Sequence, residues 1–163
     1  MCKPPLSVSV VIPTHNRAPL LPRAIKSALV QFEHHDDELI VVDDGSTDDT
    51  AVVLQKYAGR IRIVQGGEGG AGKARNLGIS VAQGDLVAFL DSDDEWMPGK
   101  LAAQRALMQR RKDILFAFGN MACTFVDGSI PGRCARQAVV SGPSQGYTKE
   151  SGALGSPSAP PVS

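Results

Sequence analysis

Residues 84–95 read GDLVAFLDSDDE, in which an apolar run suited to a buried strand ends directly in an acidic cluster. The cluster places four carboxylates within five residues: Asp91, Asp93, Asp94 and Glu95. An acidic cluster can start a helix, but capping needs only one carboxylate and the next helix is expected several residues later. A divalent cation removes the repulsion between carboxylates, and diphosphate oxygens complete its shell. The stretch therefore predicts a metal–nucleotide site at the end of a strand.

Strands and helices alternate along the chain around this stretch. Apolar and β-branched runs predict strands over 7–12, 38–42, 61–64, 86–90 and 114–118, the last resumed at 122–126. We expect Pro13 to end the first of them. Helical spacing of apolar residues predicts helices over 19–31, 48–57, 71–82 and 98–111. The alternation implies right-handed crossovers and a doubly wound, mainly parallel α/β sheet.

The pattern stops near residue 128, which sets the expected domain limits. Residues 5–128 are expected to form one ordered domain, a size common for single domains. Residues 129–163 are rich in Gly, Ser and Pro without sustained periodicity, and we expect them to form a disordered tail.

The bulk composition limits the function classes. Lys plus Arg equals Asp plus Glu at 17 each, which argues against nucleic-acid binding. The start has no apolar signal core, and no apolar run approaches membrane-spanning length. A cytoplasmic protein is expected, and peripheral contact with the inner face of the membrane is left open.

Three polar clusters follow the ends of predicted strands. They are 13–17 (PTHNR), 43–46 (DDGS) and 91–94 (DSDD). In open α/β sheets the ligand binds beyond the carboxyl ends of the strands, so all three clusters are expected at one edge. This convergence favours a single binding site.

Several residues near this edge admit two interpretations. Asp43 could accept a hydrogen bond from a nucleobase or ribose, or serve only the turn that follows it. Arg75, after the glycine-rich stretch 66–72, could reach a phosphate or only bridge carboxylates. His15 could lie against a nucleobase, or it could be a loop residue without a role in binding.

Four stretches together closely resemble the family 2 glycosyltransferases, inverting enzymes of the GT-A fold. They are SVVIPTHNR (9–17), ELIVVDDGSTDDT (38–50), GGAGKARNLGI (69–79) and GDLVAFLDSDDEWMPGKL (84–101), in the order and spacing of the family. The resemblance implies a donor-binding portion that takes a nucleotide-diphospho-sugar, with a UDP- or dTDP-sugar expected. A glycan or lipid would be the acceptor.

The resemblance also implies roles for individual residues. Pro13, Thr14 and His15 would line the nucleoside pocket, and Asp43 would recognise the base. Asp91-Ser92-Asp93 looks like the DXD motif of the family, with Asp93 as the direct ligand of Mg²⁺ or Mn²⁺ and Asp91 placing ribose or a metal-bound water. Arg75 is carried over as a donor-binding residue.

The general base is the part of the family pattern that the sequence lacks. Inversion needs a carboxylate to deprotonate the acceptor hydroxyl, and the family supplies it from a later, acceptor-binding half. Asp127 and Glu150 have no matching context. A truncated chain or a non-catalytic nucleotide-sugar-binding module is therefore the alternative. A nucleotidyltransferase is disfavoured because 13–16 is not its glycine-rich loop.

Overall fold

A four-stranded parallel sheet forms the centre of the molecule. The computed structural model describes residues 5–119 and 139–141. The strands β1 (Val8–Thr14), β2 (Glu38–Asp43), β3 (Arg62–Gln65) and β4 (Leu86–Phe89) lie in the order β3-β2-β1-β4, and each neighbouring pair is parallel. The predicted doubly wound, mainly parallel sheet is confirmed.

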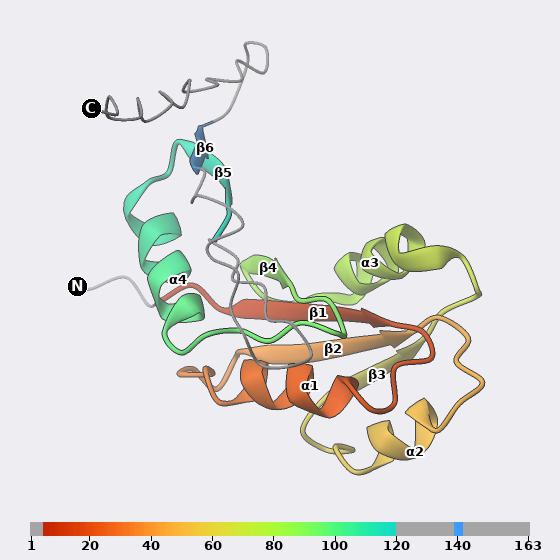
Figure 1. The fold of residues 1–163 in the computed structure, drawn as a ribbon. Coiled ribbons are helices and arrows are strands. Elements are labelled where there is room, and N and C mark those ends of the chain that lie inside the picture. Colours follow the sequence, from red (N-terminus) through yellow and green to blue (C-terminus); the bar gives the residue numbers. More distant parts are fainter. Residues whose placement is uncertain (1–4, 120–138, 142–163) are drawn as a thin grey trace, which may run out of the picture.

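Helices cover both faces of this sheet. They are α1 (Leu21–Leu29), α2 (Thr50–Gln55), α3 (Gly70–Val81) and α4 (Lys100–Arg110). Figure 1 shows α1 and α2 below the sheet and α3 above it. Because successive side chains of a strand point to opposite faces, each central strand supplies a core on both sides.

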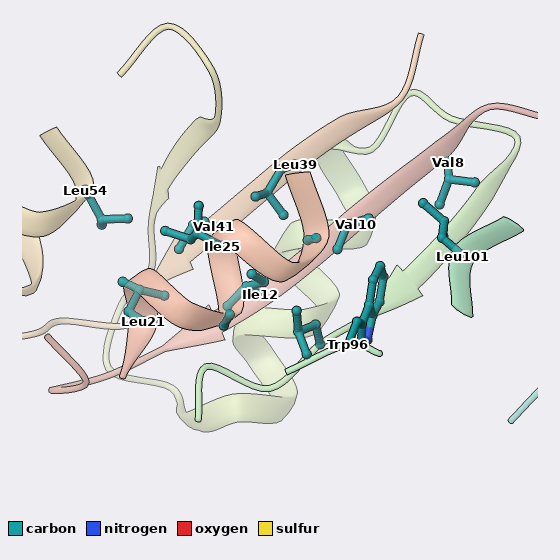
Figure 2. Close-up of a cluster of buried hydrophobic side chains, with 13 residues drawn as sticks. Val8, Val10, Ile12, Leu21, Ile25, Leu39, Val41, Leu54, Trp96 and Leu101 are labelled. Atoms are coloured by element: carbon teal, nitrogen blue, oxygen red, sulfur yellow. The ribbon is translucent and has the colours of Figure 1, made fainter. Parts of the chain in front are cut away.

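The larger core lies on the α1 side of the sheet. Alternate residues of β1 and β2 pack there against Leu21 and Ile25 of α1, and Trp96 and Leu101 extend the cluster toward α4 (Figure 2). Trp96 is 7% exposed and belongs to the same buried cluster as Leu101 of α4.

The smaller core, on the α3 side, brings helix and sheet into unusually close contact. Val11, Ile40 and Val42 meet Ala74 there. At Gly78 a Cβ atom would lie 2.3 Å from Cγ1 of Val11. The missing side chain of Gly78 therefore allows α3 to approach β1 at the point where the helix crosses the strand.

The first strand differs from the prediction at Pro13, which does not end it. Val11 accepts a hydrogen bond from Leu90, so the polar backbone groups of Val11, and of Pro13 two residues on, face the β4 side. Pairing with β4 ends at Val11, whereas pairing with β2 continues to Thr14. Proline is tolerated because its missing N–H faces a side where the pairing has already ended.

The strand expected at 114–118 forms, but outside the parallel sheet. β5 (Ile114–Ala117) pairs antiparallel with β6 (Val139–Ser141), which falls in the range expected to be a tail. The continuation expected at 122–126 lies outside the described residues.

Candidate functional site

An open cleft of about 800 Å³ lies at the carboxyl edge of the sheet. Residues 13–17 line it after β1, Asp44 after β2, and residues 91–93 after β4. Glu68, Gly70, Ala71, Ala74 and Arg75 close another side. The cleft falls within the usual size of small-molecule sites, roughly 300–1,000 Å³. Six predicted residues meet in it: Pro13, Thr14, His15, Arg75, Asp91 and Asp93.

Thr14 lines this cleft and has a buried hydroxyl without a hydrogen-bond partner among the described residues. It is the last residue of β1 and is 3% exposed. A buried hydroxyl without a partner costs about 1–3 kcal/mol. A polar ligand atom in the cleft would remove that cost.

The loops after β1 and β2 are joined by side-chain to backbone hydrogen bonds. Nδ1 of His15 lies 2.9 Å from the carbonyl oxygen of Asp44. Asn16 adopts a left-handed backbone (φ 52°), and its Oδ1 accepts from the amide of Thr47 at 2.8 Å. Asparagine tolerates this conformation better than most residues. The contacts hold the His15 ring over the β2 loop.

Asp43 lies at the expected edge, beside Thr14 in the β1–β2 register, but does not line the cleft. Its carboxylate is buried, and Oδ1 accepts from the amide of Ser46 at 3.0 Å. This contact is the turn interaction that the sequence offered as the alternative. Recognition of a base by Asp43 stays a prediction.

Asp44 lines the cleft, although the sequence singled out only its neighbour Asp43. Its carboxylate accepts from the amides of Gly69 at 2.9 Å and Gly70 at 2.6 Å, and it is 6% exposed. It thereby anchors the glycine-rich loop to the end of β2 and positions the start of α3. The signal was an acidic pair at a strand end, but the sequence does not show which member faces the loop.

Arginines meet the acidic cluster at the other end of the cleft. Arg75 donates to Oδ1 of Asp91, which is the carboxylate-bridging alternative considered for this residue. Nε of Arg17 lies 3.9 Å from Oδ2 of Asp93. Burial, and then the charges of Asp93 and Asp91, raise the pKa of Asp94. Nε of Arg23 lies 3.5 Å from Oε2 of Glu95, so three arginines face the four carboxylates of the cluster, which keeps a net negative charge.

These carboxylates fit a divalent cation held jointly with a phosphate ligand. The part of the chain that the structure describes has no group of three or more His, Cys, Asp or Glu side chains arranged to hold a metal. Mg²⁺, however, is usually bound by one or two carboxylates, with phosphates and water completing its shell. Asp91 and Asp93 are each about half exposed and line the cleft, so both can serve in that way.

The fold and the cleft define an open α/β domain that binds its ligand at the carboxyl edge of the sheet. The sequence model of glycosyl transferase family 2 matches residues 9–129. The chain belongs to glycosyltransferase family 2, and its sheet and flanking helices are of the GT-A type. This assignment removes the nucleotidyltransferase alternative.

Named relatives support the assignment. A GalNAc(5)-diNAcBac-PP-undecaprenol β-1,3-glucosyltransferase of Campylobacter jejuni is 42% identical over 119 residues, covering 69% of this chain and 37% of the relative. The alignments with three other glycosyltransferase relatives cover 31%, 49% and 18% of the length of those proteins. The chain therefore spans about half of their length or less.

Solved structures that resemble the chain include two with a bound nucleotide-sugar. S. aureus TarS 1–349 in complex with UDP-GlcNAc aligns with a TM-score of 0.62 and 32% identity, covering 68% of this chain and 34% of TarS. The mannosyltransferase PcManGT of Pyrobaculum calidifontis, in complex with GDP-Man and Mn²⁺, aligns with a TM-score of 0.58 and 28% identity. The alignment covers 68% of this chain and 34% of PcManGT. None of the described helices is long and apolar enough to span a membrane.

Proposed function

We propose that the protein binds a nucleotide-diphospho-sugar in this cleft, with a divalent metal, and serves transfer of the sugar to an acceptor with inversion. The observation that carries the proposal is the single cleft that joins the unsatisfied Thr14 hydroxyl to the Asp91 and Asp93 carboxylates. A polar group at one end and an acidic pair at the other suit the two ends of a nucleoside diphosphate.

The residues divide the work along the cleft. Thr14 and His15 hold the nucleoside, and Asp43 at the adjoining strand end recognises its base. Asp93 is the direct ligand of Mg²⁺ or Mn²⁺, and Asp91 places ribose or a metal-bound water. When bound, the cation supplies electrostatic stabilisation of the charge that develops on the leaving diphosphate. Arg75, the neighbour of Asp91, adds positive charge on the same side.

The similar proteins indicate which class of nucleotide and which class of acceptor to expect. TarS was solved with UDP-GlcNAc and PcManGT with GDP-Man, so we extend the expected UDP or dTDP donor to include GDP. The Campylobacter relative is named for an undecaprenol-linked glycan, which favours a lipid-linked glycan acceptor in cell-envelope polysaccharide synthesis. We place this work in the cytoplasm, at the inner face of the membrane.

A second candidate is a binding module without turnover, because the described residues offer no suitable general base beyond the acidic cluster. Among the described residues that follow the cluster, Asp113 is the single carboxylate. A hydrogen bond from Arg111 lowers the pKa of Asp113 to about 2. A general base works best with a pKa near the operating pH, so Asp113 is a poor one.

Calorimetric titration with UDP and with GDP, each with and without Mn²⁺, tests the proposal. We expect Mn²⁺ to raise the affinity for one nucleotide at least tenfold, and Asp93→Ala to abolish that gain. Asp113→Ala is the matched control, because it removes a carboxylate away from the cleft. Metal-independent binding, or a gain that survives in Asp93→Ala, would contradict the metal site. Sugar transfer by the purified chain would reject the binding-module candidate.

A further inference from the structure

Arg17 stands at the metal end of the cleft, where no role was expected for it. It follows the PTHN segment after β1, and its Nε lies 3.9 Å from Oδ2 of Asp93 on a loop 76 positions later. Its side chain is 47% exposed and lines the cleft together with Arg75 and Asp91. The arginine is therefore accessible to a ligand rather than locked in the fold.

The backbone of Arg17 is fixed although its side chain is free to change partner. Its amide donates to Oγ1 of Thr50 at 3.3 Å, and its carbonyl accepts from Leu20 and Leu21 at the start of α1. The side chain also donates from Nη1 to the carbonyl oxygen of Asn16 at 3.3 Å. An exposed ion pair of this length contributes at most about 1 kcal/mol, so exchanging it is inexpensive.

Nε of Arg17 lies 3.9 Å from the Asp93 oxygen that would hold a cation, close to where the other ligands of that cation would lie. Mg²⁺ binds its ligands at about 2.1 Å in an octahedron, so a phosphate oxygen next to the Asp93 oxygen lies roughly 3 Å from it. A guanidinium at ion-pair distance from Asp93 must therefore move aside or bond that phosphate.

Charge balance favours a bond between the Arg17 guanidinium and the phosphate. Two carboxylates and the diphosphate of a nucleotide-sugar bring about four negative charges, and a divalent cation neutralises half of them. Arg17 and Arg75, which line the cleft beside these groups, carry two positive charges that offset the remainder. Guanidinium groups also match phosphate oxygens geometrically, through two parallel N–H donors.

We propose that Arg17 exchanges its partner on donor binding, from the Asp93 carboxylate in the free protein to the diphosphate in the loaded protein. This inference rests on the proposed function and adds to it a residue that acts in both states. In the free protein Arg17 competes with the cation for Asp93. In the loaded protein it binds the leaving group.

The exchange predicts opposite effects of one substitution on two ligands. In Arg17→Gln, Mn²⁺ alone should bind about 3- to 10-fold more tightly, because a competing cation is gone. In the same variant the nucleotide, UDP or GDP, should bind about 10-fold more weakly at saturating Mn²⁺. Free Mn²⁺ is measured by electron paramagnetic resonance, and nucleotide binding by calorimetry, on the full chain.

Two further variants make the result decisive. Arg62→Gln removes an arginine that donates to the carbonyl of Val81, away from the cleft, and should leave both affinities unchanged. Arg17→Lys keeps the charge and should restore part of the nucleotide affinity. Thermal unfolding checks that each variant is folded.

The failures are distinguishable. Wild-type protein that binds neither nucleotide with Mn²⁺ rejects the proposed function and this inference with it. Normal wild-type binding that is unchanged in Arg17→Gln rejects the exchange alone. A fall in both affinities also rejects it, because Arg17 would then support metal binding rather than compete with it.

Discussion

Arg105 and Asp37 form a buried ion pair at the amino-terminal edge of the sheet, opposite the cleft. Nη2 of Arg105 lies 2.6 Å from Oδ2 of Asp37, and the side chains are 4% and 0% exposed. Asp37 also accepts from the amides of Val8, Glu33 and His34. Nε and Nη1 of Arg105 have no hydrogen-bond partner in the described part of the chain. The pair ties α4 to the sheet, and its two members are unequally satisfied.

That inequality predicts an asymmetric cost of substitution. Asp37→Ala leaves the buried guanidinium with only the longer contact to the exposed carboxylate of Glu33, 3.8 Å from Nη1, and strips three amides of their acceptor. It should therefore lower the free energy of unfolding by about 3 kcal/mol. Arg105→Met keeps an apolar stem and leaves Asp37 with its amides, and should cost clearly less. Urea unfolding measures both. Equal losses, or a larger loss in Arg105→Met, would contradict this account.

Thr14 and Thr50 are both buried threonines, but they should respond oppositely to valine. Thr14→Val removes a hydroxyl without a partner, so stability should hold or rise by up to about 1 kcal/mol while nucleotide affinity falls about 3- to 10-fold. In Thr50 the hydroxyl accepts from the amide of Arg17 and donates to Asp48. Thr50→Val should therefore cost about 1–2 kcal/mol. Chemical denaturation with parallel calorimetry tests the contrast, which a comparable destabilisation of the two variants would disprove.

Two glycines of α3 allow a matched test of helix–sheet contact. Gly78→Ala places a methyl group 2.3 Å from Val11 Cγ1, so overpacking should cost about 1–3 kcal/mol despite the better helix propensity of alanine. At Gly72 nothing lies within 4 Å of the added Cβ, and Gly72→Ala should gain roughly 0.5–1 kcal/mol. The melting temperatures of the two variants should shift in opposite directions. A stabilised Gly78→Ala variant would show that α3 is not held by this contact.

Lys100 makes stability depend on alkaline pH. Burial lowers the pKa of Lys100 from 10.5 to about 8, although its Nζ lies 3.6 Å from the centroid of the Trp96 ring. Below pH 8 the folded and unfolded chains both hold the proton, so the cost of burying the ammonium group is constant. Between pH 8 and 10.5 the unfolded chain binds more protons, so the free energy of unfolding rises with pH.

We expect this rise to be on the order of 2 kcal/mol across that window, and to be absent in Lys100→Met. The difference in unfolding free energy between the two proteins isolates the contribution of Lys100 from other groups that titrate in alkali. Parallel curves for the two proteins would refute the assignment.

The sheet could be predicted because each of its strands is recognisable from its own local sequence. Runs such as SVSVVI and ELIVV are apolar on both faces, as a sheet covered on both sides requires. The antiparallel partner of β5 could not be found in this way. Its three residues lie more than 20 positions downstream in a segment without periodicity, so only tertiary pairing reveals them.

The location of the candidate site at the carboxyl edge of the sheet could be predicted, but the contacts among its residues could not. Strand ends place Thr14, Asp91 and Asp93 at one edge regardless of side-chain conformation. The partners of these residues depend on distant elements. Arg17 meets Asp93 on a loop 76 positions later. Asp44 accepts from the amides of Gly69 and Gly70, whereas Asp43 accepts from that of Ser46.

The helix that carries Arg75 into the cleft is also the helix that Gly78 docks on Val11, a single turn further along. If the cleft binds the proposed donor, the affinity for that donor and the packing of α3 on β1 depend on the same helix. Bulky replacements at Val11, which does not line the cleft, should therefore weaken nucleotide binding as loss of Arg75 does.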